Sequence, residues 1–117
     1  MKFLDKLFGR STEKEIVEHA VIIHFKYGKS QMDELYKLRD TIENRIKAQI
    51  LGEYDGHEIA TDLSDGYLYM YGPNAEHLFN GIKPILDETD FMQGAKAKLR
   101  FGPPEDGIKE ITIEIGK

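Results

Sequence analysis

The sequence predicts an α+β fold in which two helices cover one face of an antiparallel sheet. Three observations lead to this prediction. Five stretches alternate apolar and polar residues with the two-residue period of a strand, and two stretches repeat apolar residues at three- and four-residue spacing, as a helix does. Glycine and proline separate these stretches as turns. With 117 residues, 40% of them hydrophobic, the chain is long enough to bury a core within one domain.

The first strand and the first helix are predicted between residues 19 and 50. Residues 19–27, HAVIIHFKY, alternate throughout and are apolar enough for a central strand. Gly28 breaks this strand, and Ser30 is a good N-cap for a helix over residues 31–50, which Gly52 stops. The apolar stripe of this helix is Leu35, Leu38, Ile42 and Ile46.

A tyrosine-rich hairpin follows in HEIATDLSDGYLYMYG, residues 57–72. The dipeptide Asp65-Gly66 fits a two-residue type I′ turn. The pairs that this turn predicts are Ser64–Tyr67, Leu63–Leu68, Asp62–Tyr69, Thr61–Met70 and Ala60–Tyr71. In this register the aliphatic residues lie on one face and the tyrosines on the other. We therefore expect the tyrosines to face away from the helices.

The remaining elements complete a plait. Pro73 and Asn74 begin a second helix, in which Pro84 predicts a kink or a restart. Residues 95–101, AKAKLRF, and 109–115, KEITIEI, predict a last hairpin with one buried face. The order β-α-β-β-α-β-β matches a ferredoxin-like, split β-α-β plait with spatial strand order 2-3-1-4 and one extra C-terminal strand beside strand 4.

The N-terminal residues are set apart from this domain, which we assign to residues 16–117. Residues 1–15 are interpreted as a short amphipathic helix and a polar connector. The apolar side of the helix is Phe3, Leu4, Leu7 and Phe8, and Lys2, Lys6 and Arg10 add positive charge. Because an isolated helix this short is marginal in water, it needs a surface to pack on. The candidates are its own domain, a partner protein, and weak contact with a membrane.

Composition excludes several classes of protein. The absence of cysteine rules out a disulfide framework, a thiolate zinc site and a cysteine nucleophile, and is compatible with a cytoplasmic location. A net charge of −5 disfavours a general binder of nucleic acid or of anionic membranes. No apolar run approaches the roughly 20 residues that span a bilayer.

The outward tyrosine stripe is the predicted interaction surface. The residues assigned to it are Tyr67, Tyr69, Tyr71, His24, Lys26, Asp62 and Glu58. Tyrosine is enriched at protein contacts because its ring buries area while its hydroxyl stays hydrogen-bonded. The face should be neutral, with Lys26, Lys96, Lys98 and Arg100 balancing Glu58, Asp62, Glu110 and Glu114. We expect a homodimer or a protein partner here; the plain alternative is a monomer with half-exposed or arm-covered tyrosines.

The same strand resembles strand 3 of the RNA-recognition motif family, in which outward aromatic side chains stack on bases. Gly66, Tyr67 and Tyr69 fit that pattern. Asp65 stands where the family has a basic residue, and Leu68 and Gly72 depart from it as well. The resemblance implies a binder of single-stranded nucleic acid as the alternative function.

No reaction is predicted from the polar residues. The densest cluster, YDGHE at residues 54–58, offers Asp55, His57 and Glu58, with Asp62 nearby. Strand alternation sends His57 and Glu58 to opposite faces, and Glu58 and Asp62 would stand about 13 Å apart. His19, His24 and His77 lack metal-ligand spacing. We therefore expect no catalytic, cofactor or metal site, and an enzyme is the less favoured interpretation.

A broader resemblance covers most of residues 19–115. The stretches YDGHE, DGYLYMYGP and NAEHLF, with a late RFGPP turn, are similar to those of a group of small uncharacterised bacterial proteins. The group has the layout YDG-x-E, LY-x-YGP-x-A and LF. This likeness implies a bacterial plait in the cytosol and implies no activity. Size and acidity alone suggest one more alternative, an inhibitor or immunity protein that masks a basic partner.

Overall fold

The computed structural model describes residues 18–116, and the predicted arm with Phe3, Leu4, Leu7 and Phe8 lies outside them. The elements are β1 (His19–Lys26), α2 (Asp33–Gln49), β2 (Glu53–Ile59), β3 (Asp65–Gly72), α3 (Ala75–Asp87), the 3₁₀ turn η2 (Asp90–Met92), β4 (Lys96–Arg100) and β5 (Glu110–Glu114). The strands form an antiparallel five-stranded sheet in the order β2-β3-β1-β4-β5. The predicted α+β class and strand order are confirmed.

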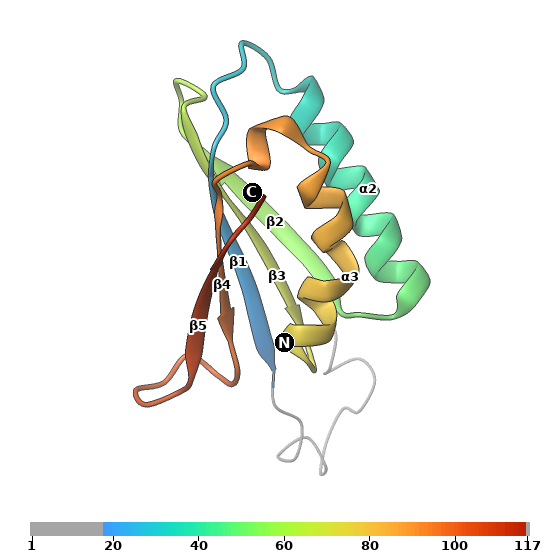
Figure 1. Ribbon diagram of the computed structural model, residues 1–117, viewed down its shortest axis with the longest axis vertical. Coiled ribbons are helices and arrows are strands. Elements are labelled where there is room, and N and C mark those ends of the chain that lie inside the picture. Colours follow the sequence, from blue (N-terminus) through green and yellow to red (C-terminus); the bar gives the residue numbers. More distant parts are fainter. Residues whose placement is uncertain (1–17, 117) are drawn as a thin grey trace.

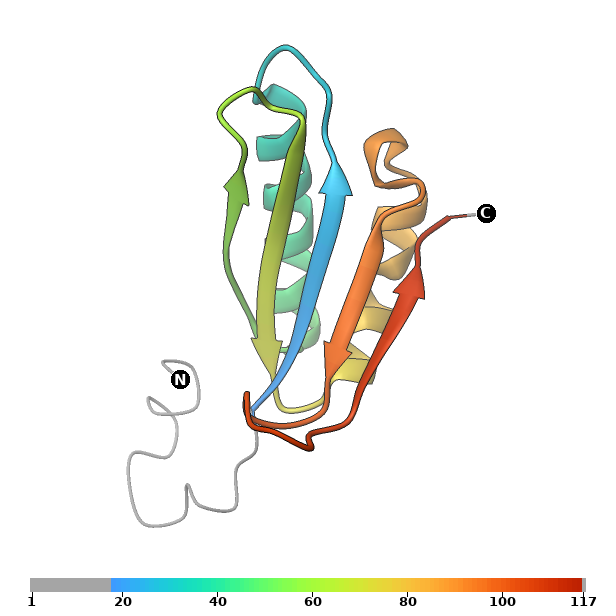
Figure 2. The same cartoon turned by 90° about the vertical axis from the view of Figure 1, so that its left-hand side faces the viewer.

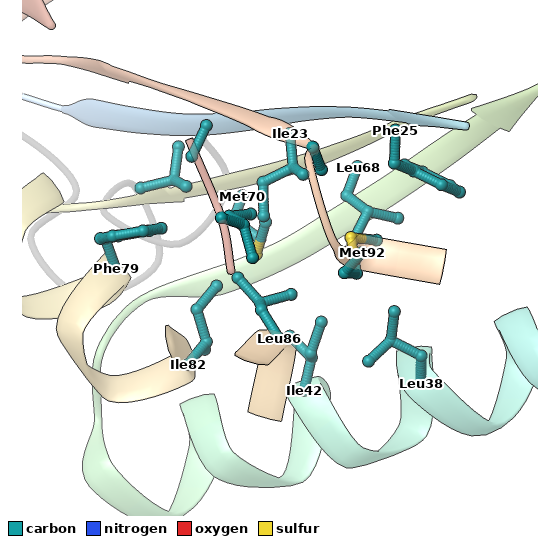
Figure 3. Close-up of a cluster of buried hydrophobic side chains, with 14 of the residues drawn as sticks. Ile23, Phe25, Leu38, Ile42, Leu68, Met70, Phe79, Ile82, Leu86 and Met92 are labelled. Carbon is teal, nitrogen blue, oxygen red and sulfur yellow. The ribbon is translucent and has the colours of Figure 1, made fainter. Parts of the chain in front are cut away.

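Both helices pack on the same face of the sheet, as Figure 1 shows, and Figure 2 looks onto the other face. The core fills the layer between the sheet and the helices (Figure 3). Ile23, Leu68 and Met70 point into this layer from the central strands, and each is fully buried. Ile42 and Leu86 meet them from α2 and α3. No helix in residues 18–116 is long and apolar enough to cross a membrane.

Helix α2 begins without the predicted serine cap. Its N-cap residue is Met32, whose side chain makes no capping bond. The hydroxyl of buried Tyr27 instead accepts a hydrogen bond from the Leu35 backbone N–H at 3.3 Å and donates one to the Gln31 carbonyl. A tertiary contact from the end of β1 therefore satisfies a first-turn donor, which is why Ser30 is not needed.

Helix α3 begins as predicted. The Asn74 side chain accepts from the His77 backbone N–H at 3.0 Å. The Nδ1 atom of His19, at the start of β1, accepts from the Ala75 backbone N–H at 3.0 Å and so satisfies a second free donor. Pro84 lies inside the helix, which continues to Asp87 without the predicted restart.

The predicted two-residue turn at Asp65-Gly66 is wrong. Both residues belong to β3, where Asp65 is level with Lys26, and Gly66 lies between Ile59 and Phe25. The chain turns instead over residues 60–64. The Asp62 carboxylate accepts from the Ser64 backbone N–H and hydroxyl there, and Leu63 has a φ of 64°.

Packing explains why glycine is needed inside the strand. A Cβ on Gly66 would lie 2.8 Å from the side chains of both Ile59 and Phe25. The dipeptide therefore marks a close approach between strands, although its sequence is typical of a turn. The tyrosines still face outward, because alternation within β3 does not depend on the position of the turn.

The last hairpin is confirmed, but its inner face is only partly covered. Ile115 is buried, Ile113 is half-buried, and Ile111 is 39% exposed. A hollow of about 340 Å³ lies between α3 and the β4–β5 hairpin, lined in part by Phe79, Phe101 and Ile111. The predicted buried face of this hairpin is thus fully buried only at Ile115, and Ile111 at its far end is exposed.

Candidate interaction surface

The face of the sheet opposite the helices, which we call the open face, is organised in rows. Strand pairing places outward side chains from adjacent strands at the same level. The first row is Glu53, Tyr71, Ala20, Arg100 and Glu110. The second is Gly56, Tyr69, Ile22, Lys98 and Thr112, and the third is Glu58, Tyr67, His24, Lys96 and Glu114. Asp65 and Lys26 begin a fourth row.

An aromatic cluster occupies the middle of these rows. The rings of His24 and Tyr67 stack across β1 and β3 with centroids 4.5 Å apart and planes 12° apart. Tyr69 lies beside Tyr67 with centroids 6.1 Å apart and planes 15° apart. Tyr67 is 37% exposed, while Tyr69, Tyr71 and Ile22 are half-buried. Large rings therefore reach solvent at the centre of the sheet, on the side that faces away from both helices (Figure 2). The loop between β4 and β5 projects on this side, and Ala20 in the first row is fully buried.

Two carboxylates hold the cluster in place. Nε2 of His24 lies 2.9 and 3.0 Å from the two carboxylate oxygens of Asp65. The hydroxyl of Tyr69 donates to Oε1 of Glu58 at 2.6 Å. This hydrogen bond raises the pKa of Tyr69 to about 12, with smaller contributions from burial and from the charge of Glu58. The phenol is therefore neutral at physiological pH and is not set up as a base.

The charges of the open face form columns that follow the strands. Lys96, Lys98 and Arg100 lie along β4, and Glu53 and Glu58 lie along β2. Pairing between β4 and β5 is less complete than the alternation predicts. Lys96 lies 3.7 Å from Glu114, but Lys98 is level with Thr112, and Nε of Arg100 donates to the Gly102 carbonyl at 2.7 Å.

The structure brings together most of the residues assigned to the surface from sequence. Tyr67, Tyr69, Tyr71, His24, Lys26 and Glu58 all lie on the open face. Asp62 does not, because it lies in the turn, where its hydrogen bonds with Ser64 lower the pKa of its carboxyl group. Gly56 occupies the position opposite Tyr69 that was predicted for Asp62, and Asp65 is a further carboxylate of the open face, level with Lys26 and bonded to His24. Asp65 was not predicted on this face, because the dipeptide Asp65-Gly66 is typical of a turn.

The candidate acid–base cluster is divided between the two faces of the sheet. Asp55 is the extra residue of a bulge in β2, and Glu58 points outward. His57 points toward α2, where Nδ1 lies 3.2 Å from the Tyr54 hydroxyl. Burial, with a smaller effect of the Arg39 charge, lowers the pKa of His57. Within residues 18–116 no group of three or more His, Cys, Asp and Glu side chains is arranged to hold a metal ion.

A small hollow lies at one end of the aromatic cluster. It measures about 240 Å³ and is lined by His24, Lys26 and Lys96 together with residues 93–95. This hollow is a depression of the open face beside His24, whose ring stacks on that of Tyr67.

Comparison of the chain with protein-family models, with curated proteins and with solved structures found no match.

Proposed function

We propose that this chain is a non-enzymatic protein-interaction module, built on a ferredoxin-like plait with one added strand, and that its open face binds a second copy of the chain. The observation that carries this proposal is the aromatic cluster of His24, Tyr67 and Tyr69 at the centre of an open sheet. Exposed aromatic groups in a defined patch are typical of contact surfaces.

The composition of the patch supports protein contact. Half-buried Ile22 and the tyrosine rings form an apolar centre, and charged residues on β2 and β4 border it on two sides. An apolar, aromatic centre with a polar rim is the usual organisation of a protein interface. The hydrogen bonds to Asp65 and Glu58 fix the rings of His24 and Tyr69 in advance. Less side-chain entropy is then lost when a partner binds.

Binding of single-stranded nucleic acid is the alternative, and the geometry favours it less. The imidazole of His24 already covers one face of the Tyr67 ring, which is the surface that a base would stack on. The carboxylates of Glu58 and Asp65 lie directly beside the cluster and would repel phosphates.

The test is the mass of the protein in solution by multi-angle light scattering across a concentration series up to about 1 mM, where even a weak dimer is populated. We expect the wild type to approach the dimer mass and Tyr69→Glu, which puts a second carboxylate beside Glu58, to remain monomeric. Tyr36→Glu is the matched control, because Tyr36 is 43% exposed on helix α2, away from the open face. A wild type that stays monomeric throughout would refute self-association.

A nucleic-acid binder would give a different set of results. Fluorescence anisotropy of a labelled single-stranded RNA at low salt should show no titration with the wild type. A titration that Tyr67→Ala abolishes and Tyr36→Ala leaves intact would replace the proposal with the alternative.

A further inference from the structure

This inference rests on the proposed function and concerns how two copies would meet. We propose that they pack open face to open face about a two-fold axis that runs parallel to the strands, midway between β1 and β3. In this arrangement β3 of each copy lies over β1 of the other, and β2 lies over β4.

The columns of the open face are complementary in pairs. The outer column on β2 is acidic, with Glu53 and Glu58, and the column on β4 is basic, with Lys96, Lys98 and Arg100. The two inner columns, on β3 and β1, hold the tyrosines and the small or apolar positions Ala20 and Ile22. From β2 to β4 the columns are therefore acidic on β2, aromatic on β3, mixed on β1, where His24 and Lys26 follow Ala20 and Ile22, and basic on β4. Beyond β4, the outermost strand β5 adds Glu110 and Glu114.

A two-fold axis parallel to the strands reverses the order of the columns and keeps every row at its own level. Glu53 then faces Arg100 of the second copy, because both belong to the first row. Glu58 faces Lys96 of the second copy, because both belong to the third row. Symmetry repeats each pair, so that opposite charges meet on both sides of the aromatic centre.

The aromatic centre fits the same axis. Tyr67 lies over His24 of the second copy, and Tyr69 lies over Ile22. The hollow of about 240 Å³ beside His24 and Lys96 then lies next to the Tyr67 ring of the second copy. Face-to-face sheets pack about 10 Å apart with their strands within about 30° of parallel, which lets outward side chains of this size interdigitate.

Other two-fold arrangements bring like charges together. A two-fold axis that lies parallel to the sheet but perpendicular to the strands places each column over the same column of the second copy, with the rows in reverse order. Glu53 then meets Glu58 of the second copy, and Lys96 meets Arg100 of the second copy. An axis above β1 places β2 over β5, where Glu53 meets Glu110 and Glu58 meets Glu114. An axis above β3 leaves the basic column of β4 outside the contact. Like-charge juxtaposition is costly at an interface, which selects against the first two arrangements, and the third forms no charge pair with β4.

The contact area sets the strength to expect. Four strands about 4.8 Å apart and about 25 Å long give a flat area of roughly 500 Å² for each copy, or about 1,000 Å² in total. This lies at the lower end of specific interfaces. We therefore expect a dimer that dissociates at micromolar concentrations and that a few charge pairs can control.

The experiment exchanges the charges of the two columns. One variant carries Glu53→Lys and Glu58→Lys, and the other carries Lys96→Glu and Arg100→Glu. Alone, each variant would place like charges against each other in the proposed dimer, and we expect at least about tenfold weaker self-association. Mixed in equal amounts, they present opposite charges at both contacts, and sedimentation velocity should show a heterodimer at wild-type concentrations.

Controls keep the result specific. A variant with Lys37→Glu and Lys47→Glu changes the net charge by the same amount as the second variant, but on the exposed side of α2. It should dimerise like the wild type. Circular dichroism of each variant confirms folding, and a single chain with all four column substitutions should recover self-association because its columns are complementary again.

The outcomes separate this inference from the function on which it rests. A wild type that is monomeric at every concentration refutes the proposed homodimer itself. If the wild type is dimeric and both charge variants also remain dimeric, the proposed axis is refuted. It is likewise refuted if the variants are monomeric but fail to associate when mixed, and the dimer then has another arrangement. Recovery of the dimer only in the mixture and in the fourfold variant supports the axis.

Discussion

His24 on the central strand β1 and Tyr67 on β3 stack their rings with centroids 4.5 Å apart, and Asp65, two residues before Tyr67, binds the imidazole at 2.9 Å. These contacts join the side chains of β1 and β3, the two strands that form the middle of the open face. It also orients the most exposed ring of the surface before any partner arrives.

Removing the acceptor of His24 should loosen the aromatic cluster. Asp65→Ala takes away both oxygens that contact Nε2 of His24. The contact is partly exposed to solvent, so we expect a loss of only about 0.5–1 kcal/mol in the free energy of unfolding. Dimerisation should weaken more clearly than folding, because the ring of His24 is no longer held. Urea unfolding and light scattering measure the two effects, and Asp62→Ala, in the turn and away from the open face, is the control for dimerisation.

The Tyr69–Glu58 hydrogen bond should appear in alkaline titration. The pKa of Tyr69 is raised to about 12 in the folded protein, and burial raises that of Tyr54 to about 12 as well. Because the folded state then holds protons that the unfolded state releases near pH 10, stability is complete below pH 10 and falls as the pH rises toward 12. Phenolate absorbance should show late-titrating tyrosines, and Tyr69→Phe should remove one of them.

The substitution Glu58→Gln tests whether the hydrogen bond to Glu58, rather than burial, raises the pKa of Tyr69. Without the carboxylate, the Tyr69 pKa should return toward its ordinary value while that of Tyr54 stays high, since burial is the main cause there. An unchanged Tyr69 titration in this variant would contradict the hydrogen bond at 2.6 Å.

Gly66 should be intolerant of even one added methyl group. The Cβ of Gly66→Ala would lie 2.8 Å from the Cδ1 atom of Ile59 and from the ring of Phe25. We expect a loss of about 1–3 kcal/mol in the free energy of unfolding, from overpacking. Because valine lacks Cδ1, adding Ile59→Val should recover part of this loss. If Gly66 were a turn residue, the second substitution would give no recovery.

The start of α2 offers a direct comparison between two possible caps. Tyr27→Phe removes the hydroxyl that accepts from the Leu35 backbone N–H and leaves a buried first-turn donor unsatisfied. We expect a loss of about 1–2 kcal/mol in the free energy of unfolding. Ser30→Ala should be nearly neutral, because the N-cap position belongs to Met32. Chemical denaturation of both variants distinguishes them, and the reverse ranking would contradict the capping role of Tyr27.

The outward direction of the tyrosines was predictable because it depends only on alternation within one strand. Tyr67 and Leu68 must point to opposite faces wherever the hairpin turns. The strand order was also predictable, since short connections and right-handed crossovers leave few alternatives for this order of elements.

Features that depend on contacts between distant residues were not predictable. The turn-like Asp65-Gly66 lies inside a strand because of packing between Ile59 and Phe25, and neither neighbour is close in sequence to the other. The cap of α2 comes from Tyr27 through a tertiary contact. Glu58 and Lys96 share a row only in the observed register of four strands. The predicted turn at Asp65-Gly66 gives β2 a different register against β3.

A nuclear magnetic resonance dilution series of the wild type is the sharpest test of self-association through the open face, because it reports both whether copies associate and which surface they use. We expect concentration-dependent shifts at Tyr67, Tyr69, Ile22 and Lys98 on the open face, with none at Tyr36 or Lys37 on α2. Shifts confined to the helices, or no shifts up to about 1 mM, would contradict it.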